Sequence, residues 1–130
     1  MSKKQNIIEH LNITVSSPEK TAKLFCTIFD WKIRWSGPSL DNGTTIHVGG
    51  ENSYLALYSH SESNIPHVNK HTTVRNLNHI GIVVNNIAEI EQKVIDQGLA
   101  PFNYREYIPG AKCFYFKVDD DIEIEVVCYG

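Results

Sequence analysis

Residues 9–15 read EHLNITV and residues 78–84 read NHIGIVV, so one short pattern occurs twice in the chain. In both copies a histidine is followed by apolar residues at every second position. His10 and His79 are 69 residues apart, and the same interval separates Ala56 from Glu125. An internal repeat determines the architecture before any other feature does. The sequence therefore predicts two copies of one folding unit.

Outward from the first histidine, residues 7–15 have the period of a strand with one buried face. Ser17 can cap a helix, Pro18 suits its first position, and the helical spacing of apolar residues ends near Asp30. Three further strands are predicted at 31–35, 44–48 and 54–58. The first unit is therefore β-α-β-β-β.

The second half has the same order of elements. A strand is predicted at 77–84, followed by a helix that is capped at 85–86 and stopped by Gly98. Further strands are predicted at 101–107, 113–118 and 122–128. The expected fold is α+β, with two tandem βαβββ modules at 5–58 and 77–130 in a single domain of residues 1–130.

Residues 59–76 are expected to form a polar linker between the modules. This stretch contains His60, His67 and His71, so a separate metal site there is one alternative. The spacing of these histidines matches no known ligand pattern, which favours the linker.

The bulk composition limits the possible partners. The chain has 130 residues, a net charge of −3 and a pI of about 6.0, whereas a nucleic-acid partner usually needs a basic face. No apolar stretch is long enough to span a bilayer, and no secretory signal precedes the first strand. Cys26, Cys113 and Cys128 are odd in number and lack CxxC spacing. We expect reduced thiols in a cytoplasmic protein.

Three of the four matched positions carry residues that bind metals, namely His10, His79 and Glu125. Two imidazoles and one carboxylate suit Fe(II), Mn(II) or similar ions, and three protein ligands leave coordination positions open for water and a chelating substrate. Each residue taken singly could instead be an ordinary core or rim side chain. Glu125 lies between Ile124 and Val126 in an apolar strand, where an unpaired charge is costly, and this favours the metal site.

The chain also resembles the vicinal oxygen chelate superfamily, which includes glyoxalase I, extradiol dioxygenases, fosfomycin-resistance enzymes and bleomycin-resistance proteins. In the first unit the resemblance rests on His10, Val15, Phe25 and residues 29–31. In the second it rests on His79, Val84 and the run FYFKVDDDIEIE at 114–125. The implied fold is a cup-shaped eight-stranded mixed sheet built from paired βαβββ modules.

The resemblance implies that His10, His79 and Glu125 are metal ligands. The fourth ligand position holds Ala56, which cannot bind a metal. This departs from the four-ligand site of glyoxalase I and matches the three-ligand pattern of extradiol dioxygenases and fosfomycin-resistance enzymes. Of the family's usual Asp-Pro-Asp-Gly turn, Asp120 remains here. The implied cofactor is a divalent metal ion, with Fe(II) or Mn(II) favoured and Zn or Ni possible.

Tyr115 alternates with Phe114 and Phe116, so it faces away from them. By resemblance to the fosfomycin-resistance enzymes, it is a candidate catalytic residue together with Glu125. It could donate a hydrogen bond to a bound oxyanion or act as an acid, or it could simply pack against its neighbours. Fosfomycin transfer itself is disfavoured, because the family's Thr two residues after the first ligand is Asn12 here.

The residues that share the parity of the ligand positions are candidate walls of a substrate pocket. They are Asn12, Thr14, Tyr54, Ala56, Tyr58 and Glu123. Each could equally be an exposed rim residue.

Two functions follow from these features. The first is a divalent-metal enzyme that acts on a small oxygenated molecule, by dioxygenase, lyase, isomerase or transferase chemistry. The alternative is a non-catalytic small-molecule binder of the bleomycin-resistance type. No nucleic acid or membrane is expected as a partner. We expect a homodimer, in which the modules pair within one chain or exchange between subunits.

Overall fold

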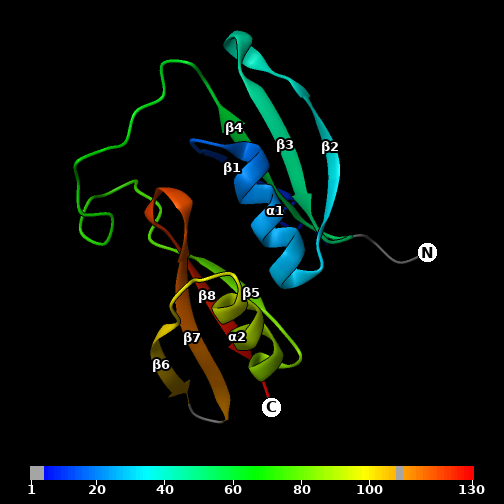
Figure 1. Cartoon of the computed structure of the whole chain (residues 1–130), viewed down its shortest axis with the longest axis vertical. Helices are drawn as coiled ribbons and strands as arrows, with labels where there is room; N and C mark the ends of the chain where they lie inside the picture. The colour runs from blue at the N-terminus through cyan, green and yellow to red at the C-terminus, as the bar shows by residue number, and fades with distance from the viewer. Residues whose placement is uncertain (1–4, 108–109) are drawn as a thin grey trace. The chain divides into compact units, whose positions relative to one another are not determined.

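The computed structural model describes residues 5–107 and 110–130. This part of the chain forms two compact units, the first ending at Ser63 and the second beginning at Asn64. Each unit has a helix and a four-stranded mixed sheet in the order β-α-β-β-β (Figure 1). The predicted α+β fold with two βαβββ modules is confirmed.

The elements of the first unit are β1 (His10–Thr14), α1 (Pro18–Phe29), β2 (Lys32–Pro38), the short helix η1 (Leu40–Asn42), β3 (Thr44–Gly49) and β4 (Tyr54–Ser59). The sheet order is β1-β4-β3-β2. β1 runs parallel to β4, and the other neighbours are antiparallel. A parallel pair needs a crossover connection, which α1 supplies.

The first strand is shorter than the sequence predicted. It begins at His10 because its ladder with β4 begins at the pair His10 and Tyr54. Ile7 and Ile8 precede this ladder and are exposed. The predicted start at residue 7 was therefore wrong by three residues.

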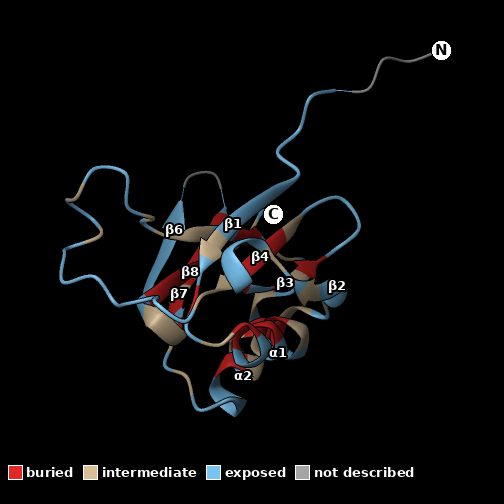
Figure 2. Cartoon of the chain, turned by 90° about the horizontal axis from the view of Figure 1, so that it is seen from above, coloured by how far each residue is buried: buried red, intermediate tan, exposed pale blue. Residues whose placement is uncertain are grey.

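The local sequence explains α1. The Ser17 hydroxyl accepts a hydrogen bond from the backbone N–H of Lys20 at 3.3 Å, and Pro18 stands in the first turn. Asp30 ends the helix in the left-handed conformation. Figure 2 shows α1 buried along one side and exposed along the other. Its buried residues include Ala22, Phe25 and Ile28.

The elements of the second unit are β5 (Ile80–Val83), α2 (Ile87–Asp96), β6 (Phe102–Tyr107), β7 (Ala111–Val118), the short helix η2 (Asp119–Asp121) and β8 (Ile122–Cys128). The sheet order is β5-β8-β7-β6, which matches the first unit. Asn86 caps α2 by accepting from the backbone N–H of Glu89 at 3.1 Å. The predicted repeat of elements is therefore confirmed at the level of topology.

One face of the second sheet forms the core of its unit. Phe114, Phe116, Ile124 and Val126 lie on that face and are at most 1% exposed. Alternation along β7 and β8 places Tyr115 and Glu125 on the opposite face, where both are half-buried. Gly81 of β5 is paired with Glu125, and nothing lies within 4 Å of where its Cβ would be. The absence of a side chain at Gly81 therefore leaves open space beside Glu125.

Within the described ranges, neither helix has the length and apolar character that crossing a bilayer requires.

Candidate functional site

His79 and Glu125 lie side by side in the second unit. Nε2 of His79 is 3.0 Å from Oε1 of Glu125, and the two side chains are 33% and 16% exposed. β5 and β8 run in parallel with Gly81 opposite Glu125. His79 precedes Gly81 by two residues, and this spacing puts it on the same face as Glu125.

Tyr115 joins this pair from the neighbouring strand. It is the cross-strand partner of Glu125, and its hydroxyl donates a hydrogen bond to Oε1 at 2.9 Å. The edge of the His79 ring meets the Tyr115 ring at a centroid distance of 5.4 Å. Burial, followed by the hydrogen bond to Glu125, raises the pKa of the Tyr115 phenol. Tyr115 therefore keeps its proton and acts as a donor at neutral pH.

The second nitrogen of the His79 ring is also engaged. Nδ1 lies 2.7 Å from Oδ1 of Asn78. An amide oxygen can only accept, so Nδ1 carries a proton and Nε2 is the nitrogen that faces Glu125. An imidazole nitrogen and a carboxylate oxygen 3.0 Å apart are spaced to share a proton or a metal cation. The residues present therefore fit two ligands of a divalent metal site.

His10 occupies the matched position in the first unit, with a different environment. Nδ1 of His10 is 2.9 Å from Oε1 of Glu9. The His10 ring stacks on Tyr54 at 4.9 Å, and the Tyr54 hydroxyl donates to the same Glu9 oxygen at 3.3 Å. The hydrogen bond from His10, followed by that from Tyr54, lowers the pKa of Glu9.

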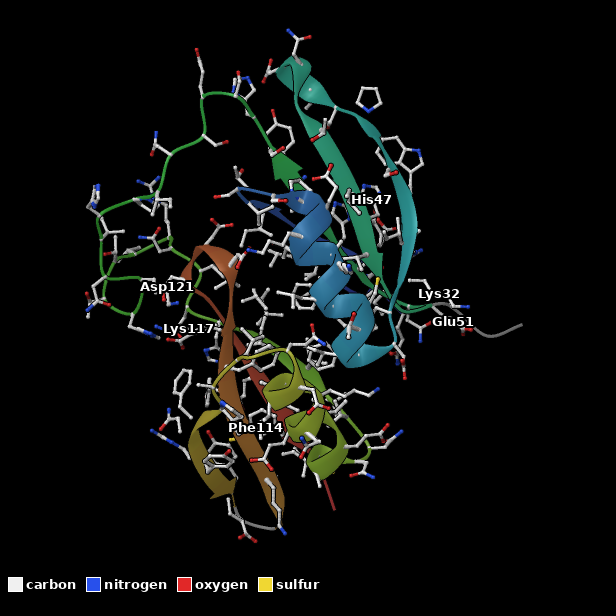
Figure 3. All side chains as sticks on the ribbon, viewed as in Figure 1. Lys32, His47, Glu51, Phe114, Lys117 and Asp121 are labelled. Atoms are coloured by element: carbon white, nitrogen blue, oxygen red, sulfur yellow. The ribbon has the colours of Figure 1, made fainter. Side chains whose placement is uncertain are left out.

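His47 belongs to the same aromatic cluster and was not predicted from the sequence. Its ring stacks on Tyr54 at 4.6 Å and meets Trp35 at 5.2 Å. Arg34 lies over the Tyr54 ring at 4.5 Å. Figure 3 labels His47 on β3. Burial lowers the pKa of His47, so the ring is neutral at physiological pH.

The pairing of strands makes His47 the counterpart of Tyr115. His47 pairs with Ala56 in the first sheet, as Tyr115 pairs with Glu125 in the second. Nine residues separate the first pair and ten separate the second. The resulting shift of one position hid the match from an alignment at the fixed interval of 69 residues.

The first unit has a methyl group where the second has a carboxylate. Ala56 is 2% exposed and pairs with Asn12 of β1 and His47 of β3. Asn12 and Thr14 are exposed on the same face as His10. The Tyr58 hydroxyl instead donates to the backbone oxygen of Leu40 at 2.8 Å, which fixes that ring at the end of the sheet.

Glu123 lies next to the candidate site, and its carboxylate contacts two side chains of the inter-module segment. It is 8% exposed, although it is charged. Nε2 of His71 lies 3.0 Å from its Oε1, and Nζ of Lys70 lies 3.7 Å from the same atom. Lys70 also binds Asp121, which Lys117 holds at 2.7 Å (Figure 3). Through these contacts, residues 70–71 of the predicted linker are bound to β8.

The structure thus brings together His79, Glu125 and Tyr115 in one unit, and His10, Tyr54 and His47 in the other. Among the residues that the structure describes, no three His, Cys, Asp or Glu side chains gather closely enough to hold a metal ion. The pair His79 and Glu125 therefore represents part of the predicted three-ligand set.

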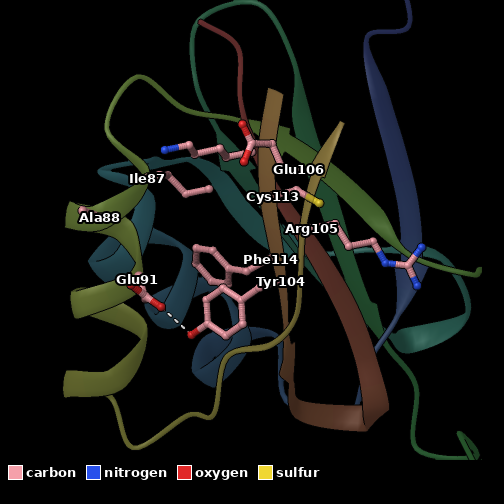
Figure 4. Close-up of a pocket in the computed structure, with 9 residues that line it drawn as sticks. Ile87, Ala88, Glu91, Tyr104, Arg105, Glu106, Cys113 and Phe114 are labelled. Atoms are coloured by element: carbon pink, nitrogen blue, oxygen red, sulfur yellow. Dashed lines mark hydrogen bonds between the residues drawn. The ribbon is translucent and has the colours of Figure 1, made fainter. Parts of the chain in front are cut away.

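A separate cavity of about 390 Å³ lies between α2 and strands β6 and β7 of the second unit (Figure 4). Tyr104 and Phe114 line it, and the Tyr104 hydroxyl donates to Glu91 of α2. His79, Tyr115 and Glu125 do not contribute to its lining. The cavity is thus distinct from the face that carries the predicted ligands.

Comparison with known proteins identifies relatives at the level of family and fold. Residues 7–100 match the model of the Glyoxalase/Bleomycin resistance protein/Dioxygenase superfamily. No curated protein matches the chain. Among solved structures, a glyoxylase/bleomycin resistance protein/dioxygenase domain from Frankia sp. EAN1pec has a TM-score of 0.80 at 19% identity, and the match covers 98% of this chain and 100% of that one.

Two further structures are similar. A glyoxalase family protein from Enterococcus faecalis has a TM-score of 0.75 at 17% identity, covering 93% of this chain and 96% of that one. The fosfomycin resistance protein FosX from Listeria monocytogenes, complexed with Mn(II) and sulfate, has a TM-score of 0.70 at 13% identity, covering 98% and 95%. At these identities the structural matches establish the fold.

Proposed function

Because the chain belongs to the glyoxalase/bleomycin resistance protein/dioxygenase superfamily, we propose that it is a divalent-metal-dependent enzyme acting on a small oxygenated molecule that chelates the metal. His79 and Glu125 supply two ligands in this proposal, and His10 supplies the third. Fe(II) or Mn(II) is the favoured ion, with Zn or Ni as alternatives.

The pair His79 and Glu125 is the observation that carries the proposal. Nε2 of His79 lies 3.0 Å from a carboxylate oxygen of Glu125, and Nδ1 is occupied by Asn78. The similar FosX structures contain Mn(II), which supports metal use in a protein of this fold. Gly81 opposite Glu125 leaves room beside the pair for a further ligand and a substrate.

Residues of both modules have separate tasks in this proposal. A bound divalent ion would polarise two neighbouring oxygens of the substrate. The Tyr115 hydroxyl keeps its proton, so it can turn from Glu125 and donate a hydrogen bond to a substrate oxygen that develops negative charge. The rings of Tyr54, His47 and Trp35 offer a stacking surface for a planar part of the substrate. We also propose a cytoplasmic location, supported by the unpaired thiols of Cys26, Cys113 and Cys128.

Metal analysis tests the proposal. Wild-type protein purified without chelator should hold a divalent ion after supplementation with Fe, Mn, Zn or Ni. His79→Ala should hold less, because it removes one ligand. His67→Ala is the matched control, since this histidine is exposed in the inter-module segment. Equally low metal content in wild type and His79→Ala would contradict the proposal.

A second candidate function is a non-catalytic binder that holds a drug or metabolite. The stacked rings on the first sheet favour it, because His10, Tyr54 and His47 form a continuous aromatic surface without needing a metal. This function predicts thermal stabilisation by a ligand in the presence of EDTA. A ligand whose stabilising effect disappears with EDTA would contradict it.

A further inference from the structure

We infer that Asn78 and Glu9 are positioning residues that select which ring nitrogen His79 and His10 present to a ligand. Each accepts a hydrogen bond from Nδ1–H, so Nε2 is the nitrogen left to bind a ligand. This inference rests on the proposed metal-binding function. It assigns a role to the residue directly before each of the two histidines.

The two contacts repeat between the modules. Oδ1 of Asn78 lies 2.7 Å from Nδ1 of His79, and Oε1 of Glu9 lies 2.9 Å from Nδ1 of His10. In both modules the oxygen comes from the residue directly before the histidine. Neighbouring side chains within a regular strand point to opposite faces, so such a contact needs a position where the strand begins. β5 begins at Ile80 and β1 at His10, which meets this condition.

Both ring nitrogens of His79 are thereby accounted for. A neutral imidazole has one N–H and one lone pair, and the partner of one nitrogen decides the role of the other. With Nδ1–H bound to Asn78, Nε2 is the nitrogen that faces Glu125 and is left to bind a cation. Without Asn78, the proton is free to move to Nε2 and donate to Glu125. That hydrogen bond would close the pair and compete with a metal ion.

Asn78 and Glu9 differ in charge, so the two histidines are not equivalent. A carboxylate behind an imidazole makes it a stronger metal ligand than a neutral amide does. Glu9 is exposed and also accepts from Tyr54, and both conditions weaken the effect of its charge. We therefore expect Asn78 to matter mainly for the choice of nitrogen, and Glu9 to add a smaller electrostatic contribution.

Calorimetric titration with Mn(II) tests the effect on binding. Asn78→Ala should weaken the affinity about 10- to 100-fold, the range typical for residues that orient metal ligands. Asn78→Asp should bind at least as tightly as wild type, because a carboxylate oxygen also accepts from Nδ1–H and makes the imidazole a stronger ligand. Glu9→Gln should lose less affinity than Glu9→Ala, since an amide oxygen still accepts. Asn64→Ala, an exposed amide in the inter-module segment, is the matched control.

Nitrogen-15 NMR of the metal-free protein tests the inference by a separate route. Wild-type His79 should show the proton on Nδ1, and Asn78→Ala should shift it toward Nε2. An unchanged pattern in Asn78→Ala would overturn the inference, and so would equal losses of affinity in Asn78→Asp and Asn78→Ala. A wild type that binds none of the metals would remove the proposed function, yet the NMR comparison would still decide which nitrogen Asn78 selects.

Discussion

At the scale of the residue, Oε1 of Glu125 is the atom that both His79 and Tyr115 contact. It lies 3.0 Å from Nε2 of His79 and accepts the Tyr115 hydroxyl at 2.9 Å. An oxygen shared in this way is held in position before any ligand arrives. This arrangement requires that Tyr115 remain protonated, and the raised pKa of its phenol meets the requirement.

The raised pKa of Tyr115 predicts a pH dependence of stability. The folded state holds the phenol proton at pH values where the unfolded chain, with a tyrosine pKa of about 10, has lost it. The stabilising contribution is therefore complete below about pH 10 and is lost as the pH rises through the higher pKa of the folded state. Urea unfolding at pH 8 and pH 11 should show a loss of stability that is smaller in Tyr115→Phe.

The matched control is Tyr129→Phe, whose ring is 70% exposed. It should lose as much stability between the two pH values as wild type does. If Tyr115→Phe and Tyr129→Phe lose equal stability between the two pH values, the hydrogen bond to Glu125 does not raise the pKa of the Tyr115 phenol.

At the scale of the element, the segment before β5 is held to β8 by charge. Lys70 binds Asp121 and lies 3.7 Å from the Glu123 carboxylate, and His71 lies 3.0 Å from it. The Lys70 side chain is 17% exposed and that of Glu123 is 10% exposed. The segment is therefore fixed against the sheet at this point, next to the strand that carries Glu125.

Lys70→Met is expected to loosen this segment, because it removes the charge and keeps the aliphatic stem. The change in global stability should be small, about 1 kcal/mol or less, as for other partly exposed ion pairs. Trypsin should cleave after Arg75 faster than in wild type, since local opening exposes that bond. Lys23→Met on the exposed side of α1 should leave the cleavage rate unchanged. Equal rates for both variants would show that the ion pairs do not restrain the segment.

The order of elements could be predicted because it depends on local signals. Ser17, Pro18 and Asn86 form the helix starts where the sequence indicated them. The ends of the strands depend on partners far along the chain, so β1 begins at His10 and not at residue 7. The start of β1 is set by its pairing with Tyr54, which lies far along the chain. No local sequence pattern could therefore predict it.

The candidate site was predictable to a similar extent. The repeat pointed to His79 and Glu125, whose side chains meet in the structure. It gave no sign of His71, because a contact across 52 residues leaves no periodic pattern. The roles of Glu9 and Asn78 had a signal that could have been used, since both directly precede the repeated histidines.

At the scale of the whole molecule, the predicted ligands are divided between the two modules. His10 belongs to the first unit, and His79 and Glu125 belong to the second. The proposed set of three ligands therefore draws on both modules. We propose that the protein forms a homodimer, in which the two modules come from one chain or from different subunits.

Mixing two inactive variants distinguishes these arrangements. His10→Ala and Glu125→Ala each remove one ligand, so each alone should bind metal poorly. If modules are exchanged between subunits, refolding the two variants together should restore about half of the sites in each mixed dimer. If the modules pair within one chain, the mixture should bind no more metal than the average of the two variants. Sedimentation of the mixture checks that dimers have formed.

Ala56 has a methyl group at the position where the second module has the carboxylate of Glu125. This difference affects how the protein can be altered. The two modules share one topology, and they differ in the side chain at this position. Laboratory selection for a new preference should therefore accumulate substitutions around His47 and Tyr54. Such substitutions would change which small molecule the protein binds and would leave Glu125 and its neighbours unchanged.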